Sequence, residues 1–226
     1  MKIVSWNVSR KKLENVELVT ALKLNADIMA FQEIRPKTNS VELGAEVNAS
    51  LLTYLPLWCN IGHGLATYNR LRDFKAINID FDGLVMTFEY EKFYFVNVSA
   101  PSTSYIGEED FWDWNRYFKS FINRMHKNKP VIAAGTFNFG TNPNDLAPVE
   151  EKAMIKLLSV GLVDIFQELN PDRGNAYTFH NNLKGLESRI DYFFISESLK
   201  DKVISASIIE EDFGSAHRPI VLEINI

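Results

Sequence analysis

Several polar residues stand where apolar, strand-like segments of the chain stop, and together they have the chemistry to handle a phosphate ester. They are Asn7, Glu33, Asn138, Asp191 and His217. The carboxylates of Glu33 and Asp191 are hard oxygen ligands of the kind that Mg²⁺ takes, with water completing its coordination. Asn7 and Asn138 can hold a substrate oxygen or a water, and His217 can stabilise charge that builds up on a phosphate. Because loops at one edge of a sandwich can converge, we expect these residues to share a cleft.

Each of these residues also has a purely structural interpretation. An Asn at a strand end is commonly a turn former, and a single Glu is commonly a solvated surface group. Arg189 and Asp191 are spaced for a local ion pair, and His217 precedes Arg218-Pro219 in what could be an ordinary loop. Residue types and spacing alone therefore leave the functional and the structural interpretations open.

Short apolar segments along the chain predict the buried strands that must position these residues. The expected strands are Ile3–Asn7, Ile28–Phe31, Leu65–Tyr68, Lys75–Ile79, Leu84–Tyr90, Phe93–Val98, Val131–Ala134, Ile190–Ile195, Val203–Ile209 and Ile220–Ile226. Apolar residues at helical spacing predict helices over Val16–Leu24, Val41–Leu52, Phe111–Met125 and Glu150–Val160. Many short strands without a regular βαβ alternation favour an α/β (α+β) sandwich, with two stacked sheets and helices outside.

Composition excludes several classes of protein. The 226 residues are 46% hydrophobic and 23% charged, which rules out a long disordered chain, a collagen and a disulfide scaffold. The single cysteine, Cys59, cannot form an internal disulfide and fits a reducing compartment. A net charge of -5 lowers the expectation of strong non-specific DNA binding. No segment approaches the roughly 18 apolar residues of a membrane span, so we expect no membrane partner. We also expect one domain over residues 1–226 and an intracellular (cytoplasmic) location.

Six segments of the chain resemble the exonuclease III and apurinic-endonuclease branch of the endonuclease/exonuclease/phosphatase superfamily. They are Lys2–Val8, Ala26–Glu33, Phe95–Pro101, Lys129–Asn138, Ser188–Phe193 and Gly214–His217. They occur in the family's order and span nearly the whole chain. The resemblance implies a four-layer αββα sandwich, in which two mainly antiparallel sheets are flanked by helices.

The same resemblance implies a Mg²⁺-dependent (or Mn²⁺-dependent) phosphodiesterase that acts on DNA as a monomer, at abasic sites or 3′ ends. Carried over residue by residue, Glu33 and its neighbour Asn7 would be the metal ligands. Asn138 would position the nucleophile or the phosphate, Asp191 would orient the site, and His217 would contact the scissile phosphate.

The chain departs from the family pattern at the centre of the implied site. The Gly-Asp-x-Asn motif has Thr136 in place of its Asp, and the Ser-Asp-His motif has Ala216 in place of its Asp. Ser99 and Ser102 replace the usual Tyr and Asn around Pro101, and Ser9 stands where an acidic residue is often found. Thr136 cannot serve as a general base, whose help is worth about 10²–10⁴ in rate. The loss at Ala216 is expected to deprive His217 of a carboxylate partner.

Three interpretations follow from an intact frame with an altered centre. The chain is a nuclease with strongly weakened activity and weakly bound Mg²⁺, or a non-catalytic module that binds DNA or phosphate. The third interpretation is a phosphodiesterase of a small substrate, which the net charge of -5 mildly favours.

Overall fold

The computed structural model describes residues 1–9, 24–35, 50–54, 64–80, 84–139, 148–173, 176–181 and 185–226. Cys59, the predicted helix over Val16–Leu24 apart from its last residue, and most of the predicted helix over Val41–Leu52 lie outside these ranges. The end of that second helix is a wrong prediction, because Ser50–Tyr54 forms strand β3. Its backbone pairs with a neighbouring strand from Ser50↔Asn69 to Tyr54↔Leu65, and this pairing overrides the local apolar spacing.

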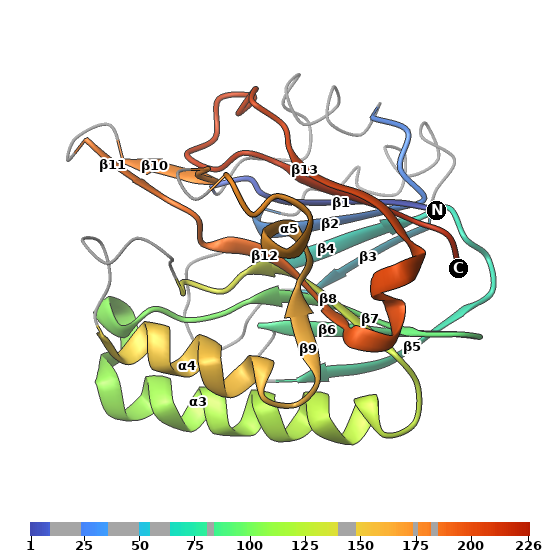
Figure 1. Ribbon diagram of the computed structural model, residues 1–226, viewed down its shortest axis with the longest axis horizontal. Helices are drawn as coiled ribbons and strands as arrows, with labels where there is room; N and C mark the ends of the chain where they lie inside the picture. Colours follow the sequence, from blue (N-terminus) through green and yellow to red (C-terminus); the bar gives the residue numbers. More distant parts are fainter. Residues whose placement is uncertain are drawn as a thin grey trace.

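Two six-stranded sheets form the centre of the molecule (Figure 1). The first sheet has the order β13 (Val203–Ile208), β14 (Ile220–Ile224), β1 (Lys2–Asn7), β2 (Ile28–Ile34), β4 (Gly64–Asn69) and β3 (Ser50–Tyr54). The second has the order β5 (Phe74–Asp80), β6 (Val85–Tyr90), β7 (Tyr94–Ser99), β8 (Val131–Thr136), β12 (Asp191–Ser196) and β9 (Leu162–Asp164). Parallel pairing joins β1 to β2 and β7 to β8, and the other neighbours are antiparallel.

Helices α3 (Thr103–His126) and α4 (Pro148–Leu158) lie against the outer face of the second sheet (Figure 1). The shorter elements are α5 (Ile165–Leu169), the 3₁₀ helix η1 (Glu197–Lys202) and a separate hairpin of β10 (Phe179–Asn181) and β11 (Leu186–Ser188). The predicted α/β sandwich of two mainly antiparallel sheets with helices is confirmed, with one parallel pair of strands in each sheet. None of the helices in the described ranges has both the length and the apolar character needed to cross a membrane.

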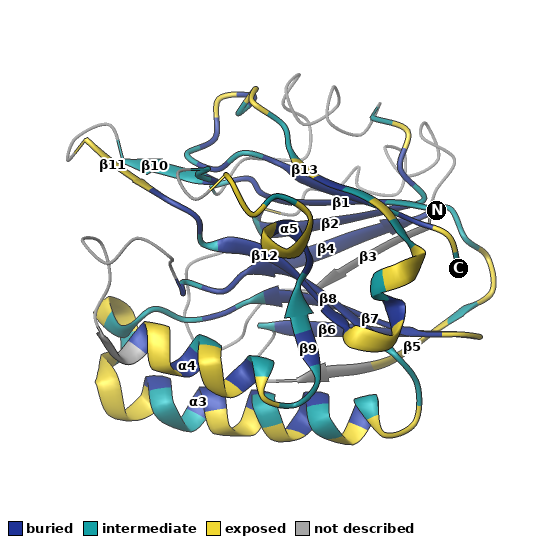
Figure 2. Ribbon diagram, in the orientation of Figure 1, coloured by how far each residue is buried: buried dark blue, intermediate teal, exposed yellow. Residues whose placement is uncertain are grey.

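Successive side chains of a strand point to opposite faces of its sheet, so one core forms between the sheets and another under the helices. In β12, Phe193 and Ile195 enter the core between the sheets, whereas Tyr192 and Phe194 face the core beneath α3 and α4. Figure 2 shows the resulting pattern, with buried strands and exposed outer turns on the two long helices. Because both faces are covered, these strands are continuous apolar segments rather than alternating ones, which is why the sequence located them well.

A buried polar contact joins the two sheets near the end where the candidate site lies. Asn97 of β7 accepts a hydrogen bond from the Gln32 side chain over 2.7 Å and donates to the Thr67 hydroxyl over 3.1 Å. Its amide nitrogen also reaches the backbone oxygens of Phe31 and Ala66. Asn97 therefore lies fully inside the sandwich and connects the sheets.

Candidate active site

The backbone register brings the ends of four strands to one edge of the sandwich. In the first sheet the parallel strands β1 and β2 end together, with Asn7 opposite Gln32. In the second sheet β8 ends where the antiparallel strand β12 begins, with Asp191 opposite Thr136. His217 comes from the segment just before β14. Two carboxyl-terminal strand ends from one sheet therefore face a strand pair from the other.

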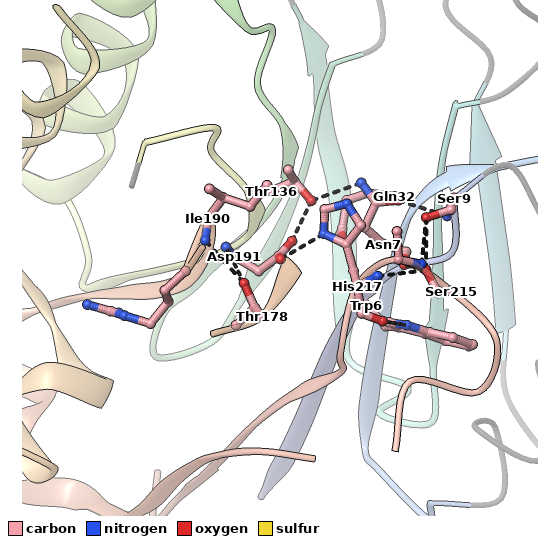
Figure 3. Close-up of polar contacts among 12 residues, drawn as sticks. Trp6, Asn7, Ser9, Gln32, Thr136, Thr178, Ile190, Asp191, Ser215 and His217 are labelled. Carbon is pink, nitrogen blue, oxygen red and sulfur yellow. Dashed lines mark hydrogen bonds and ion pairs between the residues drawn. The ribbon is translucent and has the colours of Figure 1, made fainter. Parts of the chain in front are cut away.

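A continuous chain of hydrogen bonds crosses from one sheet to the other at this edge (Figure 3). The Asn7 amide nitrogen donates to Glu33 Oε1 over 3.2 Å and to Thr136 Oγ1 over 3.0 Å. Thr136 donates to Asp191 Oδ1 over 2.6 Å, and Asp191 Oδ2 lies 2.8 Å from His217 Nδ1. The prediction that Asn7, Glu33 and Asp191 gather at one edge is confirmed.

The positions of the protons in this series of hydrogen bonds follow from the atoms that can only donate. An amide nitrogen cannot accept, so Thr136 Oγ1 accepts from Asn7 and directs its own proton to Asp191. The backbone amide of Ser9 donates to Asn7 Oδ1 over 2.9 Å, which fixes the orientation of the Asn7 side chain. Nitrogen rather than oxygen of Asn7 therefore faces Glu33. The ligand role predicted for Asn7 would require its amide to be reversed, because Mg²⁺ is bound through oxygen.

His217 keeps a carboxylate partner, which corrects the expectation drawn from Ala216. The partner is Asp191, remote in sequence, whose carboxylate bonds to Nδ1 within a site that leaves Asp191 4% and His217 6% exposed. An ionised carboxylate only accepts, so this contact places a proton on Nδ1 and fixes the ring orientation. The sequence argument failed because it took the neighbour along the chain for the neighbour in space.

Three further residues, Thr178, Arg189 and Asp164, position the Asp191 segment, and no local sequence pattern indicated Thr178 or Asp164. The fully buried Thr178 accepts hydrogen bonds at Oγ1 from the backbone amides of Ile190 and Asp191, each over 3.1 Å. The buried Arg189 pairs with the mostly buried Asp164 over 2.7 Å, and not with Asp191 as its spacing had suggested. A hydroxyl in a loop and an ion pair between distant residues have no local sequence pattern.

Asn138 lies just past β8 and points its amide at the backbone. Its side-chain nitrogen donates to the Ala100 oxygen over 2.7 Å. Asn138 has a φ of 54° and Glu33 a φ of 52°, both in the left-handed region. Asn tolerates that region, whereas Glu rarely adopts it, and such backbone strain concentrates at functional sites.

The donor set in the described residues suits a divalent cation poorly. No group of three or more His, Cys, Asp or Glu side chains placed to hold a metal occurs in the described ranges. Both oxygens of Asp191 are engaged by Thr136 and His217. Glu33 is the other carboxylate of this cluster; it is half-buried and accepts from the Asn7 amide nitrogen. Mg²⁺ relies on charged oxygens, so one such carboxylate predicts a weakly held ion.

Comparison with known proteins gives a consistent match over the whole chain. Residues 4–217 match the Endonuclease/Exonuclease/phosphatase family. Exodeoxyribonuclease of Bacillus subtilis (strain 168) is 30% identical, with both chains covered completely. Recombination repair protein 1 of Drosophila melanogaster is 31% identical over all of this chain, which spans 37% of that longer protein. The structure of an AP endonuclease from Archaeoglobus fulgidus superposes with a TM-score of 0.82 over the full length of both chains, at 16% identity, and shares the fold.

Proposed function

Because the chain belongs to the Endonuclease/Exonuclease/phosphatase family, we propose that it is a divergent DNA-binding member of the exonuclease III/AP endonuclease branch. In this proposal its Mg²⁺-dependent phosphodiester hydrolysis is strongly weakened or lost. Its ligand is DNA with an abasic site or a 3′ end, which it binds as a monomer through one domain. The names of the relatives, an exodeoxyribonuclease and a recombination repair protein, support DNA as the ligand.

The observation that carries the proposal is the direction of the Thr136 hydrogen bond. An attacking water must lose a proton, and a general base that accepts it contributes about 10²–10⁴ in rate. Thr136 stands where the resembled motif has Asp, and its hydroxyl donates to Asp191 over 2.6 Å. Asp191 is in turn committed to His217 over 2.8 Å. A site with a proton donor in the place of its base supports binding more than hydrolysis.

The remaining residues keep roles that binding requires. His217, oriented by Asp191, would donate to a phosphate oxygen, and Asn138 would position the phosphate. Glu33 would hold Mg²⁺ or Mn²⁺ weakly. When bound, the ion would supply positive charge that stabilises negative charge on the phosphate. Asn7 would hold Glu33 and Thr136 in place through its amide nitrogen.

A paired binding and cleavage assay tests the proposal. Fluorescence anisotropy with a labelled abasic duplex, an undamaged duplex and a small phosphodiester is followed by a cleavage assay on the same DNA with Mg²⁺ or Mn²⁺. We expect saturable DNA binding that weakens with salt, because contacts to the phosphate backbone release counterions. We also expect cleavage no faster than that of Glu33→Gln, with Glu151→Gln on the exposed side of α4 as the matched control. Rapid Glu33-dependent cleavage, or binding of the small ester without DNA binding, would contradict the proposal.

A further inference from the structure

Two serine hydroxyls join the loops on either side of the site. Ser9 follows β1, Ser215 precedes β14, and their oxygens lie 2.9 Å apart (Figure 3). We infer that Ser9 and Ser215 form a hydroxyl clasp that positions Asn7 and His217 without any cation. The inference concerns the free protein and does not depend on cleavage of DNA.

Ser215 is the centre of the clasp, and its hydrogen-bonding capacity is full. The backbone oxygen of Asn7 can only accept, so Ser215 donates its one hydroxyl proton there over 2.8 Å. The backbone amide of His217 can only donate, and it does so to Ser215 Oγ over 3.1 Å. Since the Ser215 proton is committed to Asn7, the bond between the two serines must be donated by Ser9. Ser215 therefore donates once and accepts twice, and it holds β1 and the His217 segment together.

Ser9 connects the same two segments from the other side. Its backbone amide donates to Asn7 Oδ1 over 2.9 Å, and its hydroxyl accepts from the Ala216 amide over 3.3 Å. The Asn7 contact determines that the Asn7 nitrogen faces Glu33 and Thr136. The clasp thus sets the orientation of the Asn7 side chain, where the series of hydrogen bonds through the site begins.

The clasp carries no charge, and this distinguishes it from an ion-held arrangement. Carboxylates at positions 9 and 216 would repel each other unless a proton or a cation compensated their charge. With Ser9 and Ala216 in those places, neutral hydrogen bonds perform the same connection. The indole of Trp6 adds a further anchor by donating to the His217 backbone oxygen over 2.9 Å, with Trp6 1% exposed. The site is therefore organised before any ion or ligand arrives.

Nuclear magnetic resonance of the free protein in EDTA tests the inference through His217 itself. The readouts are solvent exchange of the His217 Nδ1 proton, assigned by its absence in His217→Gln, and exchange of the Ala216 and His217 backbone amides. Ser215→Ala removes a donor to Asn7 and an acceptor from His217, so protection at His217 should fall by roughly fivefold to thirtyfold. Ser9→Ala should have a smaller effect at His217 and its main effect at the Ala216 amide. Ser120→Ala, on the exposed side of α3, should change neither.

Further variants separate positioning from folding. Ser215→Thr keeps the hydroxyl and should restore protection, and thermal unfolding reports whether each variant is folded. If the added methyl disturbs the fold, the double variant of Ser9→Ala with Ser215→Ala serves instead, and its effect should be less than the sum of the single effects. Adding Mg²⁺ to the wild type should leave the exchange rates unchanged. Wild-type protection that appears only with Mg²⁺, or folded Ser215→Ala with unchanged exchange at His217, would overturn the inference.

Discussion

The hydroxyl of Thr136 lies 2.6 Å from Oδ1 of Asp191 and donates its proton to that carboxylate. The same hydroxyl accepts from the Asn7 side chain over 3.0 Å, so it connects the two sheets at the edge where the site lies. Thr136 is 3% exposed, and water cannot easily replace either partner. The residue that stands where the resembled motif has Asp therefore also connects Asn7 with Asp191.

Replacing Thr136 with Val should measure this stabilisation. The change removes the donor to Asp191 Oδ1 and one of the two acceptors of the Asn7 amide nitrogen, so we expect a loss of about 1–3 kcal/mol in the free energy of unfolding. Thr87→Val is the matched control, because the Thr87 hydroxyl is buried and has no hydrogen-bond partner among the described residues. Urea unfolding of both variants checks the difference. Equal losses would mean that the Thr136 contacts contribute nothing to stability.

Asn97→Ala should weaken the connection between the two sheets. It removes the acceptor of the Gln32 side chain and the donor to Thr67 in a fully buried position, so we expect a loss of about 2–4 kcal/mol. Asn115→Ala is the comparison, since the Asn115 side chain donates to the Phe111 oxygen within its own helix. Chemical denaturation should place Asn97→Ala well below Asn115→Ala in stability. The reverse order would argue against the inter-sheet role.

Gly135 permits the close approach of β7 and β8 immediately before Thr136. A Cβ atom there would lie 1.9 Å from the Val98 backbone oxygen, a contact that no rotamer can relieve. We expect Gly135→Ala to fail to fold or to lose most of its stability. Gly185→Ala should cost only about 1–2 kcal/mol, the strain of a left-handed residue, because its Cβ would meet nothing within 4 Å. A folded, stable Gly135→Ala protein would show that the two strands are further apart than described.

Buried tyrosines should set the alkaline limit of the fold. Burial raises the pKa of Tyr68, Tyr90 and Tyr192 well above the ordinary value. A raised pKa in the folded state means that each contributes stability that is complete below about pH 10 and is lost as the pH rises further. Tyrosinate absorbance should therefore show these three tyrosines ionising only as the protein unfolds. In denaturant these tyrosines should titrate near the ordinary pKa of tyrosine. Titration near that pKa in the native protein would contradict their burial.

Much of the frame could be predicted from the sequence because most strands are buried on both faces and therefore apolar throughout. The strand ends then located Asn7, Glu33 and Asp191 at one edge, which needs only the direction of each strand. Strands β9, β10 and β11 were missed because three residues carry no usable periodicity. The monomeric state and the single domain stay predictions.

The contacts inside the site could not be predicted, because they depend on distance across the fold. The partner of His217 is Asp191, and sequence adjacency pointed instead to position 216. The Ser9 and Ser215 hydroxyls meet although 206 positions separate them. Their proton directions depend on which backbone atoms lie nearby, and no local motif specifies those.

The most direct test of the central claim is single-turnover cleavage of an abasic duplex by the wild type and by the double variant Thr136→Asp with Ala216→Asp, with and without Mg²⁺. Restoring a base is worth about 10²–10⁴ in rate, so we expect the double variant to cleave at least about a hundredfold faster in Mg²⁺ and to bind the ion more tightly. Adding Ser99→Tyr should raise the rate further, and Glu33→Gln in the same background should abolish it. A wild-type chain that already cleaves at a rate the double variant does not improve would show that another residue supplies the base and that Thr136 is not the lost function.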